Sequence, residues 1–156
     1  MIGLSAFTAN PKAGLTENTP VGSWDAGQNE IASATVLDGT AGPLTADGFF
    51  RYATLSTPLT LQVGSYTVGA EYQAGVDEYT FQTYGLSTVS GVTFGHDTFG
   101  IYNTLTLPNQ SSGYHTSDGG GYFGGNVVIP EPTTCSLLAL GIGVLVGARI
   151  LRGHSS

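Results

Sequence analysis

Apolar and polar side chains alternate along several short stretches of this chain. The clearest is Tyr66–Gln73, where every second residue from Tyr66 to Tyr72 is apolar or aromatic and the intervening residues form a second face. Strict period two with one apolar face is typical of a half-buried β-strand. Similar short runs predict further strands at 2–8, 21–25, 30–37, 49–55, 59–63, 78–84, 92–94, 99–107 and 122–129.

Turn residues separate these runs at short intervals. Asp38-Gly39 and Asp47-Gly48 are strong turn dipeptides, and residues 26–29 form a polar break between two runs. No stretch before residue 133 has the 3.6-residue period of a helix. We therefore predict an all-β body over residues 1–129, an antiparallel β-sandwich of the jelly-roll type.

The C-terminal stretch differs from everything before it. A stiff spacer (Pro130, Glu131, Pro132) precedes an uncharged run, and two prolines favour an extended, exposed backbone there. The 16 residues from Thr133 to Ala148 span about 24 Å as a helix, against a bilayer core of about 30 Å. With Ile150 and Leu151 included, we predict one membrane helix over about 133–151.

Two arginines, Arg149 and Arg152, follow the apolar run. Positive charge at this end predicts that it stays cytoplasmic while the body is exported. A buried C-terminal helix of a soluble domain is the competing interpretation, but the run has no amphipathic stripe. Gly143 and Gly147 form a GxxxG pair, which leaves helix dimerisation open.

The order of Pro-Glu-Pro box, short apolar helix and terminal arginines resembles the PEP-CTERM sorting signal of bacterial exported proteins. The resemblance covers residues 130–156. It implies recognition by the membrane transpeptidase exosortase, cleavage near the box, and delivery of the body to the cell surface or the extracellular polysaccharide matrix. This copy departs from the usual tight basic cluster, because Ile150 and Leu151 separate its arginines.

The body resembles, over about half its length, short exported β-sandwich proteins of unknown function that carry this tail. The resemblance rests on segments at 21–36, 48–72 and 119–132, and it implies no catalytic residue. Members of that family have further sequence before the position of Ile2. Met1–Leu4 lacks a basic, then apolar, signal peptide, so we expect an N-terminal portion with a signal peptide and one more strand.

Composition agrees with an exported all-β protein. Gly accounts for 24 of 156 residues and charged residues for 10%. Residues 1–129 contain ten acidic residues against Lys12 and Arg51, a net charge of −8. The absence of a basic patch argues against a nucleic-acid partner. The single Cys135 lies in the apolar run, so the body contains no cysteine for a disulfide.

Candidate chemistry in the body is weak, and we predict neither an enzyme nor a bound cofactor or metal. His96-Asp97 and His115 with Asp118 lack a presented nucleophile. Gly119–Gly121 lacks the lysine of a phosphate loop. No calcium-loop spacing links the loop acids, which are Asp38, Asp47, Asp77, Glu78 and Asp97.

Aromatic residues offer one binding hypothesis. Trp24, beside Asp25 in a predicted rim loop, is the best candidate for a glycan contact. Other aromatic residues that a sugar-stacking platform would need are Tyr72, Tyr79, Tyr84, Tyr114 and Tyr122. The sequence thus predicts a structural or adhesive matrix protein, with a carbohydrate-binding module as the alternative and extracellular polysaccharide as a partner of either.

Overall fold

The protein is all-β in the part that the structure describes, and the two-sheet arrangement agrees with the predicted class. A computed structural model describes residues 3–10, 12–57, 59–73, 76–77, 79–81, 88, 90–110 and 122–128. Within these residues the strands are β1 (Gly3–Phe7), β2 (Thr19–Asp25), β3 (Glu30–Val36), β4 (Phe50–Thr54), β5 (Tyr66–Ala70), β6 (Thr80–Phe81), β7 (Tyr122–Phe123) and β8 (Gly125–Val128).

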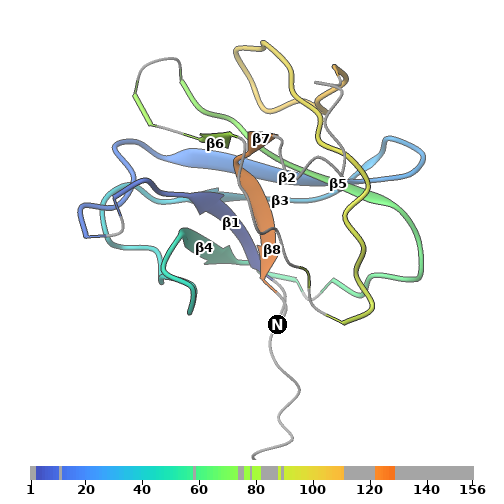
Figure 1. Ribbon diagram of the computed structural model, residues 1–156, viewed down its shortest axis with the longest axis horizontal. Helices are drawn as coiled ribbons and strands as arrows, with labels where there is room; N and C mark the ends of the chain where they lie inside the picture. The colour runs from blue at the N-terminus through green and yellow to red at the C-terminus, as the bar shows by residue number, and fades with distance from the viewer. Residues whose placement is uncertain are drawn as a thin grey trace, which may run out of the picture.

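Two three-stranded antiparallel sheets form two layers (Figure 1). The first has the order β4-β1-β8 and the second β3-β2-β5, while β6 and β7 pair as a separate short ribbon. Contacts between the layers join β4 to β3, β1 to β2 and β8 to β5. One side of the two-layer body is therefore bounded by β3 and β4, and the other by β5 and β8.

The core lies between the sheets because period two directs alternate side chains inward. In the first sheet, Leu4 of β1 lies between Ala53 and Val127. In the second, Val21 of β2 has the neighbours Ala34 and Ala70. Leu4 and Val21 are fully buried, and all six residues belong to one apolar cluster. Small alanines around two larger side chains let the layers approach closely.

The predicted turns are confirmed, and Pro20 shows how a proline fits a central strand. Residues 26–29 join β2 to β3, and Gln28 adopts a φ of 66° there. Gly48 has a φ of 81°, which suits glycine in the turn that follows Asp47. Pro20 has no backbone N–H to donate, and this costs no ladder bond because β5 ends opposite it. The Pro20 carbonyl accepts a hydrogen bond from the Glu71 amide at 2.9 Å.

Three predicted strands are wrong. Residues 59–63 form no strand, and their pattern ends in a fully exposed Val63. Residues 92–94 and 99–107 also form no strand, and the pairing of Phe99 with Gln110 is an isolated bridge. Alternation marks segments that would suit a sheet, but a strand also needs a neighbour at pairing distance. Of the predicted run 78–84, the structure shows β6 alone.

Candidate functional site

Trp24 is not in a rim loop, so this prediction is wrong. It lies within β2, and its side chain is 4% exposed. The indole covers Gly22, where an added Cβ would come within 2.6 Å of the ring, and it extends over Gly69 of the adjacent strand. Pro108 lies 3.5 Å from the same position on Gly69. With its ring packed on glycines of β2 and β5 and only 4% exposed, Trp24 offers no open face for a sugar.

Asp25 is the last residue of β2, and its carboxylate closes the turn. The backbone amide of Asn29 donates to Asp25 Oδ1 at 2.9 Å, and the Asn29 side-chain amide donates to both oxygens. These bonds lower the pKa of Asp25, with the backbone amide of Asn29 the largest cause. Asp25 thus acts as a turn residue and not as a partner of Trp24 in a glycan contact.

The other aromatic candidates divide by burial. Tyr72 is largely inside the fold, whereas Tyr79 is 49% exposed. Tyr84 and Tyr114 lie outside the described residues, and the side chain of Tyr122 is likewise not described. The structure therefore shows no shared platform of the predicted aromatic residues within its described part.

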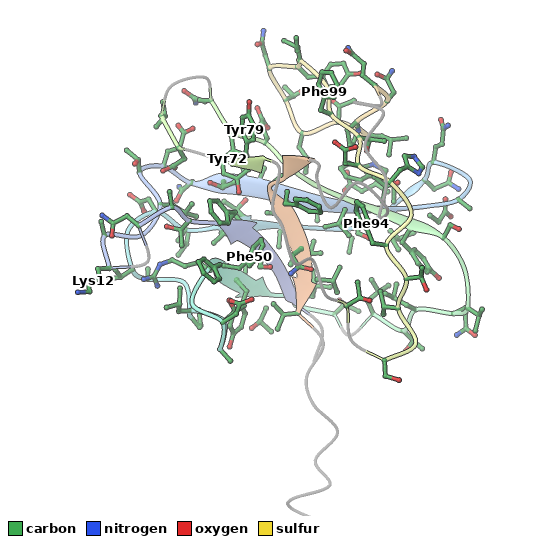
Figure 2. All side chains as sticks on the ribbon, in the orientation of Figure 1. Lys12, Phe50, Tyr72, Tyr79, Phe94 and Phe99 are labelled. Atoms are coloured by element: carbon green, nitrogen blue, oxygen red, sulfur yellow. The ribbon has the colours of Figure 1, made fainter. Side chains whose placement is uncertain are left out.

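An exposed aromatic residue that sequence reasoning missed is Tyr102. It is 41% exposed in the segment between Phe99 and Gln110, beside an 86% exposed Ile101. Its hydroxyl donates to Asn109 Oδ1 at 2.7 Å, which holds the ring at the surface. Figure 2 shows Phe99 in this segment, well apart from the two sheets. The signal in the sequence is Tyr102-Asn103, which lies within the run 99–107 that the alternation predicts as a strand.

Two acidic residues of the loops, Asp77 and Asp47, act as hydrogen-bond acceptors for backbone amides. Asp77 accepts from the backbone amides of Thr16 and Glu17, at 2.8 to 3.2 Å, and so ties two loops together. Asp47 accepts from Thr45 and from the Phe49 amide. No group of three His, Cys, Asp or Glu residues in the described part is arranged to hold a metal ion.

The two His/Asp pairs considered in the sequence differ in how much of each the structure describes. Asp97 is buried at 3% exposure, whereas its neighbour His96 is exposed. The second pair, His115 and Asp118, falls outside the described residues.

The β5/β8 side of the body is closed by direct backbone contact. A Cβ on Gly125 of β8 would come within 2.8 Å of the Gly69 carbonyl carbon and 3.0 Å of the Ala70 nitrogen in β5. The Tyr72 hydroxyl lies over this junction, donating toward Gly124 O at 2.8 Å with Phe7 O at 3.2 Å. Burial raises the pKa of Tyr72 far above its ordinary value.

The β3/β4 side contains a hollow of about 190 Å³. One wall is formed by Ile31, Ala32 and Ser33 of β3, and the opposite wall by residues after β4, namely Leu55, Ser56, Thr57 and Leu59. A second, smaller hollow of about 90 Å³ is lined by Glu17, Asn18, Pro20, Glu71 and Gln73. We call the first hollow the β3 groove.

Comparison with known proteins adds no relative: no family model, no curated protein and no solved structure matches this chain. The Pro-Glu-Pro box, the predicted helix 133–151 and both arginines lie outside the described residues. In the part of the chain that the structure describes, no helix is long and apolar enough to span a bilayer.

Proposed function

We propose that this chain is a non-enzymatic exported protein, sorted by exosortase to the cell surface or the extracellular polysaccharide matrix, where it has a structural or adhesive role. The observation that carries the proposal is the order of Pro130-Glu131-Pro132, an uncharged run, and then Arg149 and Arg152. In this proposal the run 133–151 is the inner-membrane anchor of the precursor, before processing releases a jelly-roll-like body.

The body's properties support this proposal. It is all-β in its described part, with two antiparallel sheets around one apolar cluster, and it contains no cysteine. Its excess of acidic residues favours solubility after release. A compact, acidic β-domain suits a component that is exported and then retained in a polysaccharide matrix.

Sorting can be tested with the full chain behind a signal peptide in a host that has exosortase. Glu131→Gln removes the charge of the box, and Thr133→Ser is the matched control beside it. The expected result is release of the wild type and the control, with the Glu131 variant retained in the membrane fraction. Equal release of all three proteins, or unchanged release in an exosortase deletion strain, would refute the proposal.

A carbohydrate-binding module is the second candidate, favoured by the exposed Tyr102 ring and its bond to Asn109. Aromatic rings with neighbouring amides are suited to sugar contacts, since one presents an apolar face and the other hydrogen-bonding groups. Pull-down on the host's purified exopolysaccharide would compare wild type with Tyr102→Ala and Tyr79→Ala. Binding that is lost in the first variant only supports this candidate, and equal binding by all three counts against it.

A further inference from the structure

The β3 groove is bordered by a strand edge that is open in the described structure. β3 is the end strand of its sheet and pairs with β2 on one side only. The Pro20 carbonyl points to β5, so the backbone groups of Val21 and Ser23 point to β3. The backbone groups of their partners in β3, Ala34 and Ala32, point toward β2 in return. By alternation, the backbone groups of Ser33 and Thr35 are directed outward, away from β2.

The opposite wall has the sequence pattern of a strand without the pairing. Residues 59–63 alternate Leu, Thr, Leu, Gln and Val, yet no ladder forms in this segment. Leu59 packs against the core cluster while Val63 is exposed. An open strand edge therefore lies on one side of the groove, and Leu59, the first residue of the strand-like segment, lines the other side.

The size of the groove selects the kind of occupant. Sites for small molecules have volumes of about 300 to 1,000 Å³, whereas this groove has about 190 Å³. It therefore suits one or two side chains of an extended peptide better than a whole small ligand. Its lining combines the apolar Ile31, Leu55 and Leu59 with the hydroxyls of Ser33, Ser56 and Thr57.

The charge beside the groove indicates the charge of the partner. Glu30, exposed at the start of β3, is the only charged residue of that strand, and its Oε1 accepts from Ser33 Oγ at 2.7 Å. Of the body's two cations, Lys12 is exposed at the edge of the molecule (Figure 2), whereas Arg51 is buried and donates to Gly42 O at 2.6 Å. An acidic surface favours a basic partner and disfavours a second copy of the same chain.

We propose that the β3 groove binds an extended, basic peptide segment of another protein. The peptide adds a strand antiparallel or parallel to β3, inserts an apolar side chain between Ile31 and Leu59, and places a Lys or Arg beside Glu30. Backbone hydrogen bonds to Ser33 and Thr35 supply affinity, and the groove supplies specificity, as in other strand-addition complexes. This inference goes beyond the proposed sorting and does not depend on it.

The test is selection of a displayed random heptapeptide library on the full chain in mild detergent. Ser33→Pro removes the outward amide of β3 without touching the bonds to β2, and Ser33→Ala is its matched control. We expect enriched peptides with alternating apolar residues and at least one Lys or Arg. Their affinity, measured by fluorescence anisotropy, should fall with added salt and fall about tenfold or more in Ser33→Pro, and it should fall much less in Ser33→Ala, which keeps the outward backbone amide.

Two further measurements protect the test against a variant that fails to fold. N-methylation of alternate peptide amides should abolish binding in one register and spare it in the other, with the protein unchanged. Ser56→Phe, which fills the groove, should weaken binding without affecting the β3 edge. No enrichment, enrichment that Ser33→Pro does not reduce, or insensitivity to N-methylation in both registers would overturn the proposal. A wild-type dimer in sedimentation that Ser33→Pro dissociates would also overturn it, in favour of a second copy.

Discussion

The two sides of this two-layer body are joined in opposite ways. At the β5/β8 side, backbones of the two sheets touch at Gly69 and Gly125, and Tyr72 adds hydrogen bonds to carbonyls of β1 and of the residue preceding β8. At the β3/β4 side the layers leave a groove of about 190 Å³. Two glycines permit backbone contact on the first side, whereas on the second side a hollow separates β3 from the residues that follow β4.

This difference indicates that the closed side contributes mainly to stability, whereas the open side is available for binding. Substitutions at the closed side should alter the free energy of unfolding, because the atoms there have no room to move. Substitutions along the open side should alter stability little. Four predictions test this difference, in order of decreasing expected effect.

Trp24→Ala should lower the free energy of unfolding the most, by about 3–5 kcal/mol, which is the usual loss when a large buried aromatic side chain is removed. The ring covers Gly22 and Gly69 and is 4% exposed, so its removal leaves the outer face of β2 and β5 uncovered. Urea unfolding of the variant measures the loss. Thr57→Ala in the open groove is the control and should stay within about 0.5 kcal/mol; equal effects would abolish the distinction between the sides.

Gly125→Ala should destabilise the protein by about 1–3 kcal/mol. The added Cβ would meet the backbone of Gly69 and Ala70 at 2.8 and 3.0 Å, and two backbones must move to admit it. Gly95→Ala is the matched control, since nothing lies within 4 Å of its added Cβ. Thermal unfolding of both variants gives the comparison, and a Gly125 variant as stable as the Gly95 variant would contradict direct contact between β5 and β8.

Tyr72→Phe should lower the free energy of unfolding by about 1–2 kcal/mol, because it removes a buried hydroxyl that donates toward the Gly124 and Phe7 carbonyls. Tyr66→Phe, whose hydroxyl donates to the exposed Gln62 carbonyl, is the control and should lose less. The folded-state pKa of Tyr72 is raised, so its contribution is fully present below about pH 10, the ordinary tyrosine pKa, and is lost as the pH rises further. The difference in unfolding free energy between wild type and Tyr72→Phe should therefore shrink at alkaline pH.

Asp25→Asn should have the smallest effect, because Asp25 lies in an exposed turn outside both junctions. Its pKa is lowered in the folded state, so it stabilises the fold above the ordinary aspartate pKa of about 4 and this contribution disappears as the pH falls. Carboxyl carbon NMR titration should place Asp25 below that ordinary value. Asp38→Asn is the control, since Asp38 bonds to the Asn18 side chain through its backbone amide and not through its carboxylate. If the free energy of unfolding of the two variants fell equally at acid pH, the role of Asp25 would be refuted.

Local patterns were sufficient to predict the elements that form the core. Period two located β1 to β5 and β8, and polar breaks located the turn at 26–29 and the Asp47-Gly48 turn. They were insufficient at 59–63 and 99–107, where the alternation exists but no partner strand lies alongside. Strand pairing depends on residues far apart in the sequence, and the spacing of one run does not contain that information.

The site was harder to predict than the fold for a similar reason. An aromatic residue beside an acid suggested an exposed contact at Trp24, yet the glycines that bury it lie two residues away and on another strand. The alternating residues around Tyr102 predict a strand, yet its side chain is exposed in a segment without a ladder. The burial of a side chain depends on which residues pack against it. A single sequence shows the neighbours of a residue along the chain but not its neighbours in space.

The central position of β1 has a consequence for the order of folding. β1 pairs with β4 and β8, and the Leu4–Val127 pair joins positions more than a hundred residues apart, whereas β2 and β3 form a local hairpin. Long-range pairing is slow because chain entropy is lost before contacts form. During synthesis, the hairpin is complete long before β8 leaves the ribosome. Until then β1 presents one unpaired edge, and the nascent first sheet is the part that a chaperone would have to protect.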